Sequence, residues 1–454
     1  MLKMKQTIGI CHYRIGKTDG VSLEIHKRKK ALEQLGYQVK LIAGPRSIGT
    51  DYVIEELEFD NPAILKIKEN AFFKFKNFDS VTVFRYYLYK YTEIIKQKFL
   101  KIYEKENFTY LFLHNIFTHG RHIAAAKAFC EIAEETKIQV IAVNHDFYWI
   151  GSYKDIYKPQ IPFVKQYLKK YVPPQTPKIK HAVSNSINQK ALEKRIGVKA
   201  FICPDTFDFK QQPWMKDQYN QDFLSHFGLK SNDLIVLQAT RISTRKGIEL
   251  AIEVVKQLGQ MKKKLVGKTL YNGKKITPNS QIVLILAGYA EEDSLDYKRR
   301  LQDLIKKTGI KAVFIANQIG AQRRREKGKK IYSLWDTYVY ADLVTFPSWW
   351  EGWGNQFIEA VFAKKPIIVF EYPVFRADIA KEGYQVISLG HKLKQTKAGL
   401  VTVPELQLKQ ATDQTISLLT NKTTKQLLES NFRIGKRYHS EAILIQQLKQ
   451  LLKR

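Results

Sequence analysis

Two glutamates, Glu351 and Glu359, lie eight positions apart in a segment that predicts a loop followed by a helix. Glu351 falls in the polar loop with Gly352, and Glu359 falls about one turn into the helix, which is expected to begin near Asn355. The start of a helix leaves backbone N–H groups without intrahelical partners and carries the positive end of the helix dipole, so it suits a phosphate. Ionised carboxylates accept strong hydrogen bonds from hydroxyl groups. If this helix start binds a diphosphate, the two glutamates can bind hydroxyl groups on either side of it.

Apolar segments before and after this loop and helix predict two strands of a parallel sheet. Residues 343–346 form the first strand and residues 366–370 the second, and the polar turn follows the carboxyl end of the first. Open parallel sheets bind ligands at this end of their strands. The alternative is a pair of solvated glutamates on an ordinary loop and helix. The residues predicted to bind an anion at the helix start are Gly354, Asn355 and Gln356.

A second strand end in the C-terminal half carries basic residues. Residues 234–238 predict a strand and residues 248–258 a helix, and the loop between them contains Arg241 and Lys246. Arginine offers a planar fork of donors to phosphate oxygens, whereas lysine offers a point charge. The loop is therefore a candidate phosphate-binding loop, and a basic surface loop is the alternative.

The arrangement of these motifs resembles the retaining glycosyltransferases of family 4, which have the two-domain GT-B fold. The resemblance rests on the glutamate pair between the Pro347-Ser348 strand end and the next strand, and on an arginine and a lysine five positions apart in the earlier loop. It implies that Glu351 contacts the donor sugar and that Glu359 contacts the nucleotide ribose. It also implies that Arg241 and Lys246 bind the donor's diphosphate, where cations neutralise the charge that grows as the glycosidic bond breaks.

The N-terminal half opens with a strand at residues 6–11, a loop with glycines and a helix near residues 22–35. Members of the family usually carry a Gly-Gly pair in this loop, near the donor phosphates, and here Asp19 precedes Gly20. Glycine lets the backbone approach a ligand closely. Gly20 is therefore a predicted donor-binding residue, and a plain tight turn is the alternative.

Polar side chains also follow two strands of the N-terminal half. His114 comes after the strand at residues 110–113, and His145 comes after the strand at residues 139–143. Side chains at such strand ends line the ligand crevice of a parallel sheet. His145 also resembles the histidine that family members place near the donor sugar, whereas a buried structural histidine is the alternative. The predicted catalytic residues are His145, Arg241, Lys246 and Glu351.

The 454 residues exceed the ~250–300 residues at which single hydrophobic cores stop growing. The resemblance implies an α/β protein of GT-B fold, with two Rossmann-like domains facing a central cleft. Residues 1–208 are predicted to form an N-terminal, acceptor-side domain, and residues 209–430 a C-terminal, nucleotide-sugar-binding domain. Residues 431–454 are predicted to form a terminal helix that crosses back to the N-terminal domain.

Two basic segments of the C-terminal half are predicted to be loops. Residues 262–280 resemble an inserted, exposed loop with a turn at Asn272-Gly273. Residues 318–330 predict a second basic loop, and residues 331–340 predict a helix directly after it.

The chain contains 75 lysines and arginines against 43 aspartates and glutamates, which gives a net charge of +32. Spread, solvated charges, contact with an anionic membrane and nucleic-acid binding are three alternative explanations. Nucleic acid is the least favoured partner, because no recognition-helix, zinc or RNP-like motif accompanies the basic clusters.

The three cysteines, Cys11, Cys130 and Cys203, are odd in number and far apart in the sequence, which favours a reduced compartment. The sequence has no apolar run near the ~20 residues of a membrane span, and its N-terminus has no signal-peptide pattern. We therefore expect a cytoplasmic protein, with peripheral contact at the inner membrane face left open.

The predicted function is transfer of a hexosyl group, with retention of configuration, from a UDP-, GDP- or ADP-linked sugar to a hydroxyl group. The acceptor is a sugar, a sugar phosphate, a lipid-linked or a small soluble molecule. We expect no metal and no cofactor besides the nucleotide-sugar co-substrate, because fixed cations neutralise the leaving group. The alternatives are a GT-B sugar-nucleotide epimerase, or a basic membrane-surface or nucleic-acid-binding protein with a degenerate site.

Overall fold

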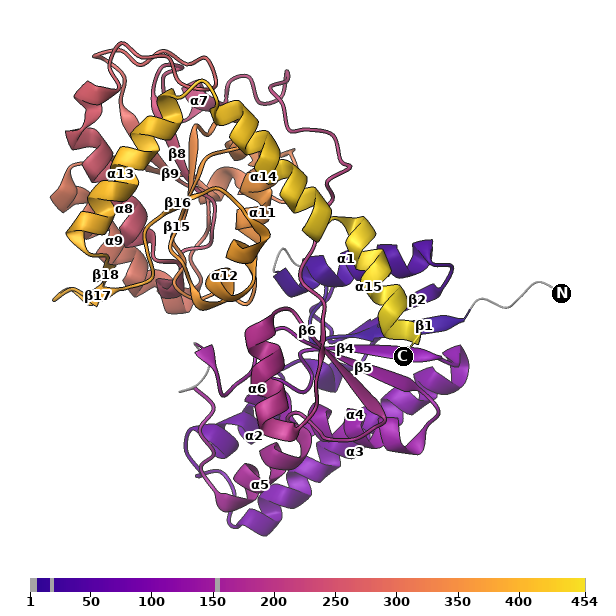
Figure 1. The fold of residues 1–454 in the computed structure, drawn as a ribbon. Helices are drawn as coiled ribbons and strands as arrows, with labels where there is room; N and C mark the ends of the chain where they lie inside the picture. The colour runs from indigo at the N-terminus through magenta and orange to yellow at the C-terminus, as the bar shows by residue number, and fades with distance from the viewer. Residues whose placement is uncertain (1–5, 17–19, 152–155, 454) are drawn as a thin grey trace. The chain divides into compact units, whose positions relative to one another are not determined.

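The structure is a computed structural model that describes residues 6–16, 20–151 and 156–453 (Figure 1). The chain divides into two compact units. Residues 1–206 and 441–454 belong to the first unit, and residues 207–440 belong to the second. No helix in the described part of the chain is long and apolar enough to cross a membrane.

The described residues of the first unit form a sheet of seven strands in the order β3-β2-β1-β4-β5-β6-β7. All neighbouring strands are parallel. The strands are β1 (Thr7–Cys11), β2 (Gln38–Ala43), β3 (Tyr52–Val53), β4 (Tyr110–His114), β5 (Gln139–Asn144), β6 (Ile179–Val183) and β7 (Phe201–Ile202). Their nearly continuous apolar sequences fit strands that are covered on both faces.

Helices cover both faces of this sheet, as Figure 1 shows. One face packs against α1 and the terminal helix α15, and the other packs against α2, α3, α4 and α5. The helices are α1 (Gly20–Gln34), α2 (Pro62–Phe72), α3 (Val81–Glu106), α4 (Ile123–Glu135), α5 (Pro162–Tyr171), α6 (Ser186–Ile196) and α15 (Glu441–Lys453). The described residues of this unit also form the 3₁₀ turns η1 (Glu55–Leu57) and η2 (Gly120–His122). The unit is therefore a doubly wound, Rossmann-like layer structure.

The second unit contains a parallel sheet whose described strands are ordered β10-β9-β8-β14-β15-β16. Its strands are β8 (Leu234–Gln238), β9 (Ile282–Leu286), β10 (Lys311–Phe314), β14 (Leu343–Phe346), β15 (Ile367–Val369) and β16 (Ile387–Ser388). Its helices are α7 (Phe223–His226), α8 (Ile248–Gln260), α9 (Leu295–Thr308), α10 (Leu334–Tyr340), α11 (Asn355–Phe362), α12 (Pro373–Ala377), α13 (Glu405–Thr420) and α14 (Thr424–His439). Along the sheet, the chain order reverses between β8 and β14, which makes this pair the topological switch point.

The prediction of an exposed loop at residues 262–280 was wrong in part: the turn at Asn272-Gly273 is present, but the segment is only partly exposed. Leu265 and Ile276 are buried, and the segment folds back onto the start of β14. Asn272 Nδ2 donates a hydrogen bond to the Asp342 carboxylate at 2.7 Å, and Lys274 Nζ pairs with the same carboxylate at 2.5 Å. Asp342 is itself buried, so these two polar residues satisfy a carboxylate that would otherwise be costly to bury.

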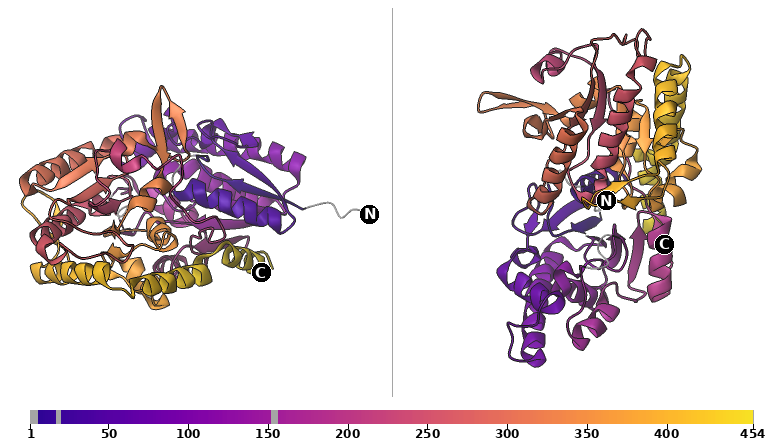
Figure 2. Two further views of the ribbon diagram at one scale, coloured as in Figure 1. Left: turned by 90° about the horizontal axis from the view of Figure 1, so that it is seen from above. Right: turned by 90° about the vertical axis from the view of Figure 1, so that its left-hand side faces the viewer.

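The basic segment after residue 318 was also predicted incorrectly. It forms a small sheet of β11 (Ile319–Gly320), β12 (Arg324–Glu326) and β13 (Lys329–Ser333), and β12 and β13 project as a hairpin (Figure 2). The helix expected at residues 331–340 begins only at Leu334, where Ser333 and Asp336 form a capping box.

The predicted terminal helix of residues 431–454 is not continuous. Helix α14 ends at His439, and α15 begins at Glu441. Helix α15 packs its buried leucines, such as Leu444 and Leu448, into the core beside α1. Tyr110 at the start of β4 donates a hydrogen bond to the Leu452 carbonyl at 2.9 Å. The last residues are therefore part of the first unit.

Candidate active site

The site in the second unit is built by the loops that follow β8 and β14. These two strands are neighbours in the sheet, with Val236 paired with Leu343 and Leu237 paired with Val344. Both loops therefore leave the same edge of the sheet at the switch point, where ligands of such sheets bind. This arrangement brings the predicted basic loop beside the predicted glutamate loop.

Glu351 forms ion pairs with two consecutive residues of the basic loop. Lys246 Nζ donates to Glu351 Oε1, and Arg245 Nη1 lies 2.5 Å from Glu351 Oε2. Lys246 is only 5% exposed and Glu351 only 7% exposed. The structure thus joins two predicted catalytic residues and adds Arg245, which the sequence analysis missed although it directly precedes Lys246 in the same loop.

Both members of this buried pair have shifted pKa values. Burial by itself raises the pKa of Glu351, but the charges of Arg245 and Lys246 outweigh that effect and lower the pKa to about 2. Burial lowers the pKa of Lys246 to about 8, with the charges of Arg245 and Arg241 acting in the same direction and that of Glu351 acting against them. At neutral pH the carboxylate is therefore ionised and the ammonium group still carries its proton.

The two loops interlock through their backbones as well. Gly247 has a φ of +58°, and a Cβ atom at this position would lie 2.5 Å from the Pro347 carbonyl oxygen. The Trp349 N–H donates to the Arg245 carbonyl oxygen at 2.9 Å, and the Trp349 indole N–H donates to the Thr244 carbonyl oxygen at 2.9 Å. These contacts hold the backbones of the two loops together.

We expect the Gly247→Ala substitution to destabilise the protein by about 1–3 kcal/mol, because it combines a left-handed backbone with a close carbonyl contact. Gly259→Ala is the matched control, since Gly259 lies in α8 and an added Cβ meets no atom within 4 Å. That control should stabilise the helix by about 0.4–1 kcal/mol. Chemical denaturation midpoints of both variants test the difference, and equal midpoints would contradict it.

The start of α11 supplies the predicted anion-binding backbone. Gly354 is its N-cap residue with a φ of +151°, and a Cβ atom there would lie 2.5 Å from the Tyr372 hydroxyl oxygen. That hydroxyl group donates to the Trp353 carbonyl oxygen, so no larger residue fits without displacing it. Asn355 and Gln356 are the first two residues of the helix. The backbone N–H groups at the start of a helix have no carbonyl partner within it.

Glu359 lies in the same helix and is 5% exposed. The Tyr338 hydroxyl group donates to Glu359 Oε2 at 2.9 Å, and Tyr338 is itself fully buried on α10. Burial, together with the Glu359 charge, raises the pKa of Tyr338 well above its ordinary value, so the hydroxyl group remains a donor. Tyr338 thus orients Glu359, a contact that no local sequence pattern indicates.

Arg241 lies at the edge of the site. Its Nη1 atom pairs with Glu291 Oε1, and both side chains are partly exposed. The backbone beside it is held by the turn after β9, because the Ile242 N–H donates to the Tyr289 carbonyl oxygen at 2.8 Å. Its charge adds to burial and to the charge of Arg245 in lowering the pKa of Lys246. Arg241 is therefore near the paired residues and bound to another carboxylate.

In the first unit, His145 belongs to a cluster of buried polar groups at the ends of β1, β4 and β5. His145 Nε2 lies 3.1 Å from His114 Nδ1, and His12 Nδ1 lies 2.8 Å from the His114 carbonyl oxygen. Burial, reinforced by the charge of Arg28, lowers the pKa of His145 and of His114 well below the ordinary value. His145 is therefore a neutral imidazole at pH 7, and its role near a sugar stays a prediction.

A carboxylate that the sequence analysis did not connect with His145 lies close to it. Asp205 Oδ1 is 4.0 Å from His145 Nδ1, and burial together with the charge of Glu24 raises the pKa of Asp205 to about 7. The backbone of His145 is also fixed, because its N–H donates to Asn115 Oδ1 at 2.9 Å. Gly20 is the first residue of α1, whereas Asp19 lies outside the described residues.

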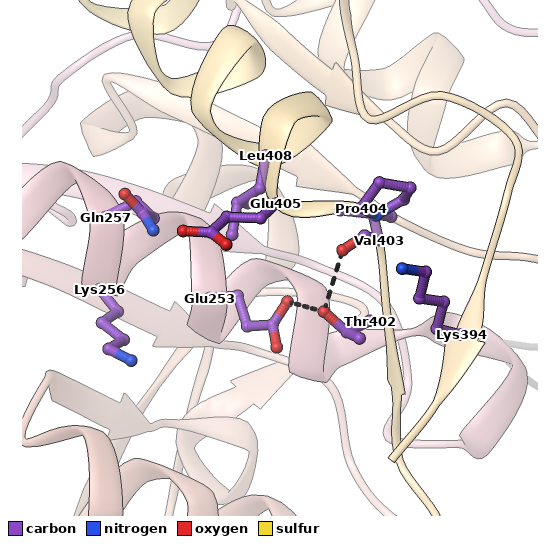
Figure 3. Close-up of a pocket in the computed structure, with 9 residues that line it drawn as sticks. All are labelled: Glu253, Lys256, Gln257, Lys394, Thr402, Val403, Pro404, Glu405 and Leu408. Atoms are coloured by element: carbon purple, nitrogen blue, oxygen red, sulfur yellow. Dashed lines mark hydrogen bonds between the residues drawn. The ribbon is translucent and has the colours of Figure 1, made fainter.

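A separate hollow of about 290 Å³ lies in the second unit, between α8 and the segment that leads into α13 (Figure 3). Inside it, the Thr402 hydroxyl group donates to Glu253 Oε2 at 2.6 Å. Its lining shares no residue with the loops that carry Lys246 and Glu351. This hollow is therefore distinct from the site at the switch point.

Comparison with known proteins identifies the family. Residues 221–433, which contain both loops of the site, match the family described as "Glycosyl transferases group 1". The mannosylglucosylglycerate synthase of Petrotoga mobilis is 37% identical over 413 residues, which cover 91% of this chain and 93% of that protein. The enzyme of the same name from Thermotoga maritima is 31% identical over 451 residues, which cover 98% of this chain and 99% of that protein.

Solved structures show the same fold at low sequence identity. Sucrose-phosphate synthase from Thermosynechococcus elongatus has a TM-score of 0.62 at 13% identity, with 99% of this chain and 98% of that chain covered. Anabaena HepE in complex with UDP has a TM-score of 0.58 at 12% identity, with 99% of both chains covered. Together with the two Rossmann-like sheets and the full-length relatives, these likenesses show that the chain is a glycosyltransferase of GT-B fold and belongs to the group 1 family.

Proposed function

We propose that the enzyme transfers a hexosyl group from a nucleotide sugar to a hydroxyl group with retention of configuration. The observation that carries this proposal is the buried Glu351 carboxylate, paired with Lys246 and Arg245 beside the start of α11. A site of this kind combines an acceptor for sugar hydroxyl groups with cations and backbone donors for phosphate. Both are needed to hold a sugar diphosphate.

In the proposed mechanism, the donor's diphosphate lies at the start of α11 and is neutralised by Lys246 and Arg241. The negative charge on the leaving phosphate grows in the transition state, so fixed cations stabilise that state more than the ground state. Glu351 accepts hydrogen bonds from the donor sugar, and Glu359 accepts them from the ribose. The leaving phosphate oxygen takes the proton of the acceptor hydroxyl group on the same face of the sugar, which retains the configuration.

The names of the two full-length relatives suggest the substrates. Both are mannosylglucosylglycerate synthases, so we propose that this enzyme adds a mannosyl group to a glucosylglycerate-type acceptor. Such an acceptor carries a carboxylate, and the net charge of +32 would favour its approach by long-range attraction. A sugar-nucleotide epimerase is less favoured, because neither relative bears such a name.

A thermal-shift panel with UDP-, GDP- and ADP-sugars tests donor binding. A ligand at 100 times its dissociation constant should stabilise the wild type by about 2.7 kcal/mol. We expect a shift with one nucleotide series, and a smaller shift for Glu359→Ala, which removes the proposed ribose contact. Glu429→Ala is the control, because this glutamate lies on the surface in a pair with Lys364. If no nucleotide sugar raised the unfolding temperature of the wild type, the proposal would be contradicted.

Product analysis separates transfer from other chemistry. Mannosyl transfer must release the nucleoside diphosphate only when the acceptor is present, whereas epimerisation leaves the nucleotide attached to the sugar. The anomeric configuration of the product, read by NMR, decides between retention and inversion.

A further inference from the structure

Arg245 bridges the two loops of the site. Its Nη1 atom donates to the Trp350 carbonyl oxygen at 2.9 Å and lies 2.5 Å from Glu351 Oε2. Its own carbonyl oxygen accepts the Trp349 N–H at 2.9 Å. The residue therefore contacts the backbone just before Glu351 and the carboxylate of Glu351 at the same time. The Arg245 side chain is 27% exposed, so it reaches the buried carboxylate from the outer side of the loop.

We propose that Arg245 is a positioning residue that holds the Glu351 carboxylate in place when Lys246 turns from Glu351 to the donor's diphosphate. This inference rests on the proposed function of the site. In the structure Glu351 has two cationic partners, and it is 7% exposed. A phosphate that attracts Lys246 would leave the carboxylate buried and without a counter-ion if Lys246 were its sole partner, which is strongly unfavourable. Arg245 removes that obstacle, because its pair with Glu351 is independent of Lys246.

The type of residue at position 245 also fits this role. Arginine keeps its charge at every physiological pH and presents its donors in a fixed plane, so one guanidinium group can bind a carboxylate and a neighbouring carbonyl oxygen together. Lysine at this position would keep the charge and lose the fixed geometry. Glutamine would lose the charge and keep a donor for the carbonyl oxygen. The two substitutions therefore separate geometry from charge.

The charge of Arg245 has a second, measurable consequence for Lys246. The Lys246 ammonium group faces Glu351, which lies in the loop after β14, and the apolar ring of Phe346, which lies on β14. Arg245 and Arg241 act on it from its own loop. Burial lowers the pKa of Lys246 to about 8, and Arg245 contributes to that lowering. Loss of the Arg245 charge should thus raise the pKa of Lys246 towards the ordinary lysine value of ~10.4. A loosened site would raise this pKa in both Arg245→Gln and Arg245→Lys, because water would reach the ammonium group, whereas loss of the charge raises it in Arg245→Gln alone.

The experiment compares Arg245→Gln and Arg245→Lys with the wild type. We expect both variants to lose about 10²-fold in kcat, because a carboxylate that is displaced by about 1 Å no longer fits the transition state. The pH profile of kcat/KM reports the free enzyme. Its alkaline limb should lie near pH 8 for the wild type and for Arg245→Lys, and should move upwards for Arg245→Gln. Arg299→Gln is the control, since Arg299 is an exposed residue of α9 that pairs with Asp296.

Two results would overturn the inference. One is a kcat of Arg245→Gln within a few fold of the wild type. The other is a loss of activity in both variants that comes with a lower unfolding midpoint and with no shift of the alkaline limb, or with the same shift in both, which would show a purely structural role. An NMR titration of ¹³Cε-labelled lysine, with Lys246 assigned through Lys246→Arg, provides a readout that does not need activity.

The same titration keeps the inference distinct from the proposed function. If the wild type transferred no sugar from any nucleotide sugar, the proposed function would fail. The titration would still decide on Arg245: an upward shift of the Lys246 pKa in Arg245→Gln alone supports the coupling, and an unchanged pKa, or the same shift in Arg245→Lys, overturns it.

Discussion

Replacing Lys246 with methionine is expected to lower kcat/KM for the nucleotide-sugar donor by about 10³-fold. Among the described residues of the loop after β8, Lys246 has the one ammonium group that is buried against Glu351. This group remains protonated at neutral pH. Methionine has a similar length and no charge, so it removes the cation while it fills most of the space. Glu351 keeps Arg245 as its partner, and the variant should therefore still fold.

Release of nucleoside diphosphate under steady-state conditions measures this effect. Lys256→Met is the matched control, because Lys256 is an exposed lysine of α8, the helix that follows the loop. The control should have the activity of the wild type. Turnover of Lys246→Met within a few fold of the wild type would show that another group neutralises the leaving phosphate.

The second large effect is expected for Glu351→Gln, which should lower kcat by about 10²-fold. Glutamine has the same shape as glutamate but no charge, and hydrogen bonds to a charged group are worth about 1.5–3 kcal/mol. The substitution also leaves Lys246 and Arg245 facing each other without a counter-ion, because both pair with this carboxylate. Steady-state assays at a saturating donor concentration measure the change, and Glu429→Gln on the surface of α14 serves as the control. A kcat equal to that of the wild type would refute the role of Glu351.

The same variant should have a different pH dependence of stability. The pKa of Glu351 in the folded protein is about 2, below the ordinary value of 4.5. As the pH falls, Glu351 therefore takes up a proton in the unfolded chain before it does so in the folded protein. The ionised carboxylate contributes of the order of 3 kcal/mol to the free energy of unfolding above pH 4.5, and this contribution is lost towards pH 2. The difference in unfolding free energy between wild type and Glu351→Gln should thus shrink as the pH falls below 4.5. Denaturant unfolding at pH 7 and pH 3.5 measures it, and a constant difference would contradict the ion-pair interpretation.

The sequence predicted the elements of the site well, because local patterns determine them. The apolar runs that became β8, β14 and β15 are flanked by polar turns, and α11 begins at Asn355 as expected. The two glutamates, Arg241 and Lys246 could be proposed as site residues because their types and spacing are local properties. Resemblance to a known family added the roles expected of them, which spacing alone does not determine.

Local sequence patterns gave wrong predictions for segments whose structure is decided by a distant partner. Residues 262–280 carry many lysines and were expected to be exposed, yet the buried Asp342, far away in the chain, holds Asn272 and Lys274. Strands β12 and β13 pair as a hairpin where a loop was expected, and the following helix begins only at Leu334. In both cases a tertiary contact outweighed the local preference.

The sequence by itself determined which residues stand at the strand ends of this protein: Arg241 and Lys246 after one strand, Glu351 after another, and Glu359 one turn into a helix. The tertiary structure decided which of them meet. Only the placement of β14 next to β8 brings Glu351 onto Lys246 and Arg245, and only the packing of α10 brings Tyr338 onto Glu359. The physical reason is that strand order and burial are set by the packing of the whole sheet, and that the pKa values of Glu351 and Lys246 depend on the charges and the exclusion of water that this packing creates.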